Sequence, residues 1–329
     1  CSLEARYLQI FKGDEIEFPE DGYQGEDIKD LAKEYADLNG DSLVNVSAEE
    51  RKKALVDYAL PKNIKKMQAD MEKYKIFYDK WFFESELHKS GAVKAVVDLL
   101  TEKGLTYEKE GAVWYKNKEV LTQKLLKEGK SQKYIDNLEL KDDVLIRQNG
   151  NPTYFTADIA YHKNKFDRGF TTLIDVWGAD HHGHVMRMKG AMDAIGYDGD
   201  KLNVVLMQLV KLVKDGELVK MSKRTGKAIQ LGDLLDEVPV DSARFLFNTK
   251  EANTQMDFDL DLAVSQDNQN PVYYVQYAHA RICSIFKSLA KEGISPRECT
   301  DAELALLTAP EEKELINHLA SYTNEIISA

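Results

Sequence analysis

The chain has 329 residues, of which 43% are hydrophobic and 30% are charged. This balance is typical of a globular protein and argues against extensive disorder. The net charge is −12, from 44 Lys and Arg against 56 Asp and Glu, which excludes a surface covered in nucleic-acid-binding charge but not a local basic patch. No apolar run approaches the ~20 residues that cross a bilayer, and we see no signal peptide, so we expect a cytoplasmic protein.

The three cysteines are too few and too scattered for a disulfide framework or a zinc knuckle, so we expect reduced thiols at Cys1, Cys283 and Cys299. The sequence begins inside a helical pattern without Met and stops just after another one. We therefore expect a fragment or a chain with trimmed ends.

Helical patterns dominate the first hundred residues. Residues 1–12 are predicted to form a helix ended by Gly13, and residues 27–38 form a second helix before Gly40. The second helix is expected to present one apolar face, made of Ile28, Leu31, Tyr35 and Leu38.

A capping box is expected at Ser47 and Glu50, and it opens a long charged helix. Pro61 should bend or restart that helix. Residues 89–102 predict a further helix with inward positions at Val93, Val96, Val97 and Leu100. Two short strands follow, at 105–108 and 112–115, with a turn at Gly111.

A strand–helix–strand unit is predicted next, with buried strands at 171–177 and 202–207 and a helix at 184–195. Short links between such elements favour a parallel sheet with a right-handed crossover. Ligands of such sheets bind beyond the carboxyl ends of the strands. The unusual residues 178–182 and 208–227 both follow these ends, so we expect them on one rim.

From Val240 onward we expect helices. Residues 251–270 contain five acids and no Lys or Arg, as is common at a junction between domains. Pro271 suits the first turn of a helix that runs to about Lys291. Its inward positions are predicted to be Val275, Ile282, Ile285 and Leu289.

The sharpest local feature is a basic loop with the sequence KMSKRTGK at 220–227. Residues 211–227 hold six Lys or Arg and two acids within an acidic protein. Such a loop after a parallel strand suits polyphosphate, because its ammonium groups can stabilise charge on departing phosphate oxygens. An ordinary solvated basic loop is the alternative.

The order of motifs resembles that of bacterial arginyl-tRNA synthetases, a class I family. The blocks that carry the resemblance are FPEDGYQG at 18–25, WFFES at 81–85, YFTADIAYH at 154–162, WGADHHG at 177–183, VKMSKRTG at 219–226 and PVYYVQYAHAR at 271–281. The resemblance implies an α/β fold: a class I Rossmann-type catalytic domain over 1–250 with an insertion at about 40–150, then a junction and an all-helical anticodon-binding-type domain over 251–329.

A guanidinium is planar, always charged and fork-shaped, so its pocket requires carboxylates and a flat partner. Tyr154 and Asp158 are four residues apart and share a face if this segment is helical. The resemblance implies that Asp158 and Glu84 bind the guanidinium of arginine while Tyr154 forms a side wall. Solvated surface carboxylates are the commoner alternative.

The cluster Asp180, His181, His182 and His184 admits two interpretations. A zinc site is one, although the adjacent His181 and His182 do not easily face one ion. The resemblance implies instead that His181 contacts the substrate amino group and His184 the nucleotide. For His182 we expect an ordinary structural role. Residues 181–184 match H-x-G-H, the form of the HIGH motif of class I synthetases, but His184 lies only 36 residues before Lys220. The true HIGH motif is expected before Cys1, so this chain alone is expected to be inactive.

The resemblance implies an arginine–tRNA ligase that is an enzyme of protein biosynthesis. It would use ATP with Mg²⁺ as a substrate complex, with no tightly bound cofactor or structural metal, and would have tRNA(Arg) and L-arginine as partners. Lys220 and Lys223 are the expected catalytic residues. Further nucleotide contacts are expected at Gln208, Met221 and Ser222. We expect a monomer without membrane contact, and a requirement for tRNA before the first step.

Two alternative functions stay open on the sequence. One is a zinc-dependent hydrolase built on Asp180, His181 and His184, and the other is a non-catalytic RNA-binding relative. An aromatic stripe with Tyr273, Tyr274, Tyr277 and Arg281 could contact RNA by stacking, but packing is the commoner role of such a stripe.

Overall fold

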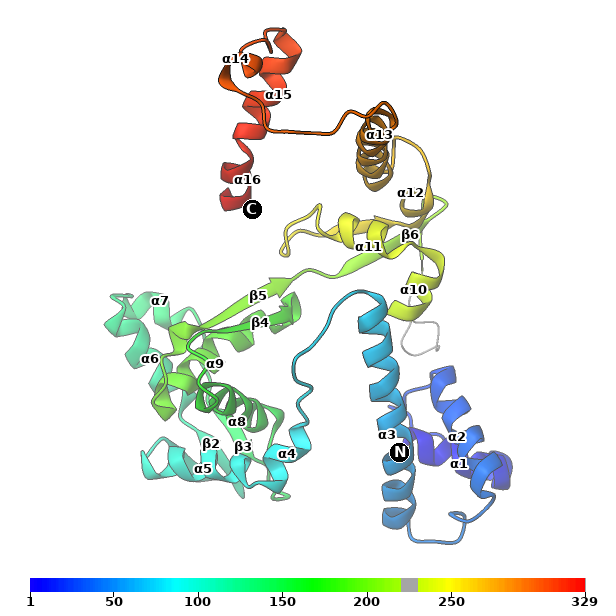
Figure 1. Cartoon of the computed structure of the whole chain (residues 1–329). Helices are drawn as coiled ribbons and strands as arrows, with labels where there is room; N and C mark the ends of the chain where they lie inside the picture. Colours follow the sequence, from blue (N-terminus) through cyan, green and yellow to red (C-terminus); the bar gives the residue numbers. More distant parts are fainter. Residues whose placement is uncertain (220–229, 329) are drawn as a thin grey trace. The chain divides into compact units, whose positions relative to one another are not determined.

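A computed structural model describes residues 1–219 and 230–328 of the chain. It divides into two compact units, Cys1–Ser265 and Gln266–Ala329. The first unit mixes helices with parallel and antiparallel strands, and the second is helical, as predicted (Figure 1).

Three helices form the start of the first unit: α1 (Ser2–Lys12), α2 (Glu26–Asn39) and α3 (Ala48–Lys73), with a 3₁₀ turn at Gly13–Glu15. Their small core contains Tyr7, Ala32, Ala36, Leu43 and Leu55. The predicted helices are confirmed, and the core does not cover the whole apolar face predicted for α2, since Leu38 is exposed. Small alanines at positions 32 and 36 let α1 pack closely against that helix instead.

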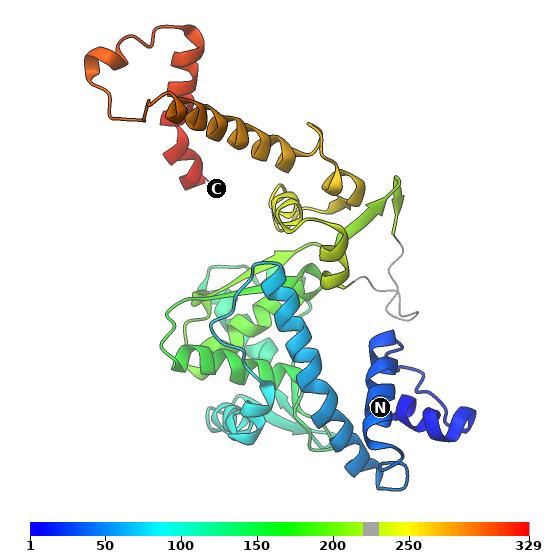
Figure 2. The same ribbon diagram turned by 45° about the vertical axis from the view of Figure 1, so that its right-hand side comes forward.

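The start of α3 is capped as predicted, because the Ser47 Oγ accepts a hydrogen bond from the Glu50 N–H at 3.2 Å. The predicted restart at Pro61 does not occur, since α3 continues through this residue (Figure 2).

The predicted helix at 89–102 is confirmed as α5 (Ala92–Glu102), and a short helix that was not predicted, α4 (Glu84–Lys89), precedes it. Gly91 separates them with a φ of 77°, a left-handed conformation that glycine adopts at little cost. The predicted strands are confirmed as β1 (Thr106–Lys109) and β2 (Ala112–Tyr115), and β3 (Asp143–Ile146) completes an antiparallel sheet. Between β2 and β3 lie α6 (Asn117–Lys127) and α7 (Gln132–Asp136).

The predicted strand–helix–strand unit is confirmed. It consists of β4 (Leu173–Gly178), α9 (His182–Ile195) and β5 (Leu202–Met207), and the two strands pair in parallel with Asp175 opposite Val204. Short 3₁₀ turns at Ala179–His181 and Gly199–Lys201 complete the links. Helix α8 (Tyr154–Asp167) precedes β4 and packs with α9 and α5.

The strands of this unit are less buried than predicted. Side chains alternate across a sheet, and only one face of β4 and β5 packs on the main core. Ile174, Val176 and Met207 on the other face are exposed. The continuous apolar character of these strands predicted burial of both faces. Among the described residues, only one face is covered.

A three-stranded sheet follows, with β6 (Val210–Lys214) between β7 (Glu217–Leu218) and β8 (Met256–Asp259). Its core includes Leu212, Leu234, Leu246 and Phe258, and it packs with α10 (Leu231–Glu237), α11 (Val240–Phe247) and α12 (Leu260–Val264). The prediction of helices from Val240 onward was wrong at β8. Alternate burial along Met256–Asp259 is the pattern of a strand, and the acids within it hid this pattern.

The second unit comprises α13 (Pro271–Lys291), α14 (Asp301–Leu304), α15 (Pro310–Ala320) and α16 (Tyr322–Ser328). The start of α13 is confirmed, with Pro271 in its first turn and Asn270 accepting a hydrogen bond from the Val272 N–H at 3.1 Å. Val275, Ile282 and Ile285 are exposed, so their predicted burial was wrong.

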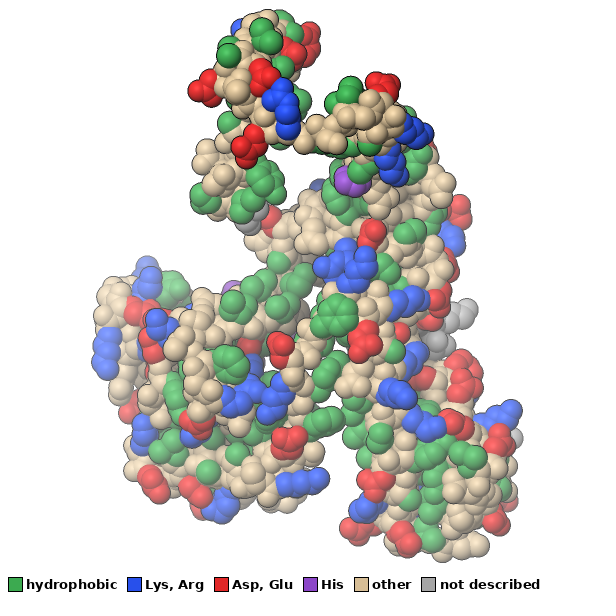
Figure 3. All heavy atoms as spheres, in the orientation of Figure 1, with side chains coloured by type: hydrophobic (Ala, Val, Ile, Leu, Met, Phe, Trp, Pro, Cys, Tyr) green, Lys and Arg blue, Asp and Glu red, His purple; other side chains and the backbone are tan. Residues whose placement is uncertain are grey.

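Too few described elements pack on α13 to cover its apolar positions. Hydrophobic side chains are accordingly visible on the surface of this unit in Figure 3. None of the helices in the described part of the chain combines the length and apolar character needed to span a membrane.

Candidate active site

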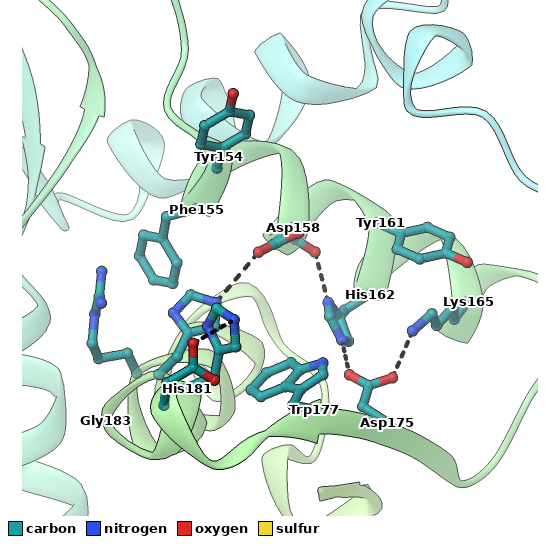
Figure 4. Close-up of a pocket in the computed structure, with 13 residues that line it drawn as sticks. Tyr154, Phe155, Asp158, Tyr161, His162, Lys165, Asp175, Trp177, His181 and Gly183 are labelled. Carbon is teal, nitrogen blue, oxygen red and sulfur yellow. Dashed lines mark hydrogen bonds and ion pairs between the residues drawn. The ribbon is translucent and has the colours of Figure 1, made fainter. Parts of the chain in front are cut away.

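A cavity of about 620 Å³ opens between α8, β4 and the start of α9 (Figure 4). Its lining residues are Tyr154, Phe155, Asp158, Tyr161, His162, Lys165, Asp175, Trp177, Asp180, His181, Gly183, His184 and Arg187. Most of these side chains are polar or aromatic. The cavity lies at the rim where the sequence predicted ligand binding, next to the carboxyl end of β4.

Helix α8 contributes one polar face to this cavity. Tyr154, Asp158, Tyr161, His162 and Lys165 recur at helical spacing, so they follow one side of the helix. The opposite side buries Ile159 and Ala160 in the main core. The predicted shared face of Tyr154 and Asp158 is confirmed.

Asp158 is the cavity-lining carboxylate of α8, and 47% of its side chain is exposed. Its Oδ2 lies 3.3 Å from His184 Nε2. The His184 ring packs between Phe155 and Trp177, with centroid distances of 5.5 Å and 5.2 Å. A flat aromatic wall therefore stands beside an acid that can accept hydrogen bonds from a cation.

Asp175 is a second carboxylate in the cavity, and only 6% of its side chain is exposed. Its Oδ1 accepts a hydrogen bond from Lys165 Nζ at 2.7 Å, and its Oδ2 contacts His162 Nε2. Burial alone would raise the pKa of Asp175, but the hydrogen bonds and charges of His162 and Lys165 outweigh it and hold that pKa below its ordinary value.

The other ring nitrogen of His162, Nδ1, lies 2.7 Å from the main-chain oxygen of Asp158. The ring thus joins β4 to the turn of α8 that carries Asp158, as the dashed lines in Figure 4 show.

Arg187 forms the wall at the opposite end. Its Nε and Nη2 both donate to the carboxylate of Asp143 on β3, and its guanidinium carbon lies 4.8 Å from the centre of the Phe155 ring. Burial raises the pKa of Asp143 despite the neighbouring guanidinium. This pair supports Phe155, which in turn contacts His184.

The residues predicted to bind arginine are only partly brought together. Tyr154 lines the cavity, but it is 77% exposed and its ring points away from the Asp158 carboxylate in Figure 4. Glu84 begins α4 and contacts His88 at 3.2 Å, and it is not among the cavity's lining residues. The three-residue guanidinium pocket stays a prediction.

The predicted nucleotide and amino-group contacts are distributed differently. His181 and His184 both line the cavity, whereas Gln208 lies after β5 with its N–H bonded to the Ala252 oxygen at 2.9 Å. His182, expected to be structural, is exposed. The predicted residues of the basic loop, Lys220, Met221, Ser222 and Lys223, lie outside the described residues.

The geometry gives no support to the zinc alternative. His184 faces Asp158, while His181 Nε2 lies 3.9 Å from Asp180 Oδ2. Over residues 1–219 and 230–328, no three His, Cys, Asp or Glu side chains gather as metal ligands.

The sequence reasoning missed the network of Asp175, His162 and Lys165. Two signals could have revealed it. One is an aspartate in the middle of the apolar strand LIDVW, and the other is the helical spacing of Asp158, His162 and Lys165.

Comparison with known families decides what this cavity belongs to. The model of the "tRNA synthetases class I (R), catalytic domain" matches residues 26–283, and that of the "DALR anticodon binding domain" matches residues 275–329. The chain belongs to the arginyl family of class I tRNA synthetases. The cavity therefore lies within the catalytic part of a class I synthetase fold, and the predicted fold class is confirmed.

Two curated relatives within this family are arginine–tRNA ligases. The one from Ruminiclostridium cellulolyticum is 54% identical over 99% of this chain, and the one from Caldanaerobacter subterraneus subsp. tengcongensis is 54% identical over the whole of it. In each case the match covers 55% of the relative. The chain thus spans about half the length of these relatives.

Solved structures of the same family share the fold. A putative arginyl-tRNA synthetase from Campylobacter jejuni is 36% identical and superposes with a TM-score of 0.72, over 89% of this chain and 59% of that protein. The Thermus thermophilus arginyl-tRNA synthetase has 19% identity and a TM-score of 0.67, over 99% and 61% of the two chains, and this likeness supports the fold alone.

Proposed function

We propose that this chain supplies the amino-acid-binding and catalytic part of an arginine–tRNA ligase. The observation that carries this proposal is the match of the class I arginyl catalytic model to residues 26–283. In the first step, the carboxylate of L-arginine attacks the α-phosphate of ATP, supplied as its Mg²⁺ complex, to give arginyl-adenylate and pyrophosphate. In the second step, the arginyl group passes to the 3′ end of tRNA(Arg).

Recognition of arginine is proposed to depend on Asp158. A half-exposed carboxylate at a cavity wall can accept two parallel hydrogen bonds from a guanidinium. The histidine now beside it, His184, would give up this contact and turn toward the nucleotide. The aromatic wall of Phe155 and Trp177 limits the space on one side of the cation.

Glu84 and Tyr154 are proposed to complete the guanidinium site. Helix α4, which carries Glu84, packs against α8, which carries Tyr154. The contact of Glu84 with His88 is exposed, and exposed ion pairs contribute little free energy, so Glu84 can exchange it for a substrate cation. His181, at the rim, is proposed to contact the substrate amino group.

The remaining steps are assigned to the rim beyond β5. Lys220 and Lys223 are proposed to hold the charge of the leaving pyrophosphate, and Met221, Ser222 and Gln208 to contact ATP. An in-line displacement of this kind needs orientation and electrostatic stabilisation but no covalent intermediate. We propose residues 1–250 as the catalytic domain with an insertion at about 40–150, and 251–329 as the junction and helical tRNA-binding part of a monomer.

The test is arginine-dependent ATP–pyrophosphate exchange by the full-length protein, with tRNA(Arg) present, comparing Asp158→Asn with the unmodified enzyme. The variant should raise the KM for arginine at least about tenfold, which is about 1.4 kcal/mol of binding free energy, because a charge-assisted bond is lost. The KM for ATP should stay within about twofold.

Asp167→Asn is the matched control, because Asp167 lies on the same helix but pairs with Lys163 outside the cavity. It should leave both KM values near those of the unmodified enzyme. Exchange that does not depend on arginine would refute the proposed function. A normal arginine KM in the Asp158 variant would refute the role of this carboxylate.

A further inference from the structure

Asp175 is a cavity carboxylate that no step of the proposed reaction uses. Both of its oxygens are occupied, one by Lys165 and the other by His162. A buried charge is costly unless it is paired and hydrogen-bonded, and an apolar group of similar volume would serve stability as well. The burial of a charged Asp175 on β4 therefore indicates a role other than packing.

The geometry of His162 indicates that role. Its ring is 4% exposed, and both nitrogens face acceptor oxygens: Nδ1 the main-chain oxygen of Asp158, and Nε2 the carboxylate of Asp175. The rings of Tyr161 and Trp177 flank it, with centroids at 6.1 Å and 6.3 Å. A ring held at both nitrogens and on two sides has little freedom to move.

Lys165 completes the arrangement from the next turns of α8. Its ammonium lies 2.7 Å from Asp175 Oδ1 and 4.4 Å from the centre of the Tyr161 ring, and its side chain is 17% exposed. The carboxylate of Asp175 is thereby satisfied by protein cations. Of these two carboxylates, Asp158 is therefore the one that is open to a substrate guanidinium.

We propose that Asp175 and His162 are positioning residues that fix the Asp158 turn of α8 for binding the substrate's cation, while Lys165 prevents Asp175 from competing for it. This inference rests on the proposed function and names the groups that make its arginine site rigid. A carboxylate whose supporting turn shifts by a fraction of an ångström loses the alignment that bidentate binding needs.

The two ends of the His162 ring can be tested separately. In His162→Asn, the side-chain amide nitrogen takes the place of Nδ1 and can still bond the Asp158 oxygen. In His162→Gln, the amide nitrogen takes the place of Nε2 and can still bond Asp175. Each variant therefore keeps one hydrogen bond and loses the other.

The measurement is the KM for arginine and for ATP in tRNA-dependent ATP–pyrophosphate exchange by the full-length protein, together with the melting temperature of each variant. His162→Gln and His162→Asn should each raise the arginine KM about tenfold, because either substitution breaks the link between Asp175 on β4 and the Asp158 turn. The ATP KM should change less than about twofold in both. Asp175→Asn, which removes the charge but keeps the shape, should also raise the arginine KM selectively.

A purely structural network predicts another pattern. Both His162 variants would then lose stability and activity in parallel, or both would keep a normal arginine KM, and either result would overturn the inference. If neither folds, Asp175→Asn decides, and an unchanged arginine KM there refutes it. Failure of the unmodified enzyme to show arginine-dependent exchange would instead count against the proposed function.

Discussion

Asp158 and Asp175 lie in one cavity, yet their surroundings assign them different tasks. The exposed fraction of the side chain is 47% for Asp158 and 6% for Asp175. Asp158 has one histidine neighbour that a ligand can displace, whereas Asp175 bonds a lysine and a histidine from the adjacent helix. Solvent access and the number of protein partners thus distinguish a carboxylate that can bind substrate from one that organises the site.

The same contrast predicts the stability of two neighbouring lysine variants. Lys165→Met removes a partner of buried Asp175, so we expect a loss of about 2 kcal/mol or more in the free energy of unfolding. Lys163→Met removes a more exposed pair with Asp167, and the loss should be under about 1 kcal/mol. Urea denaturation of both variants provides the comparison. Equal losses would show that burial does not strengthen the Lys165 pair.

For single residues, the sequence predicted which side chains line the cavity better than it predicted which partners they contact. Asp158, Tyr154, His181 and His184 all line the cavity, as expected from the motifs. Glu84 does not, because its position depends on where α4 begins relative to α8, which no local pattern specifies. The partners of Asp175 come from another element, and pairing across elements becomes visible only when the helix and strand are placed together.

Among the elements, α8 contributes the most lining residues to the site, and β4, α9 and the short turn between them contribute the rest. The strand ends at Gly178, and a single 3₁₀ turn brings Asp180 and His181 to the rim before the helix begins. Helix α8 lies at the same rim with its polar face toward the cavity. Three consecutive elements therefore supply the cavity, and short links between them limit how far its walls can move apart.

Helix α3 offers a prediction that is independent of the reaction. Pro61 lies in its interior, where it has no N–H for the Asp57 carbonyl, and its side chain is exposed. Pro61→Ala should raise the free energy of unfolding by about 1–2 kcal/mol, since the regained hydrogen bond outweighs the added freedom of the unfolded chain. Thermal unfolding with Lys65→Ala, an exposed change on the same helix, serves as the control and should shift stability by less than about 0.5 kcal/mol. A less stable Pro61 variant would contradict this account of α3.

Elements with strong local signals were predictable, and those defined by distant contacts were not. The Ser47 cap, the turn at Gly111 and the first-turn Pro271 follow from local backbone chemistry and are confirmed. Strand β8 depends on pairing with β6, far earlier in the chain, and its acids resembled a linker. The inward face of α13 failed because periodicity identifies an apolar face but not the element that covers it.

For the whole molecule, the two matched family models can be compared with the two compact units of the structure. The catalytic model spans most of the first unit and extends into the second as far as residue 283, and the anticodon-binding model lies wholly within the second. Because the net charge is −12, binding of tRNA would require local basic surfaces. The activity proposed here is that of the complete enzyme, to which this chain contributes the cavity around Asp158.

A crystal structure of the full-length protein with L-arginine bound tests that central claim most directly. The guanidinium is predicted to lie within hydrogen-bond distance of the Asp158 carboxylate, with Asp175 still bonded to Lys165 and His162. Arginine bound outside this cavity, or with its guanidinium on Asp175 while Asp158 keeps its contact with His184, would contradict the account.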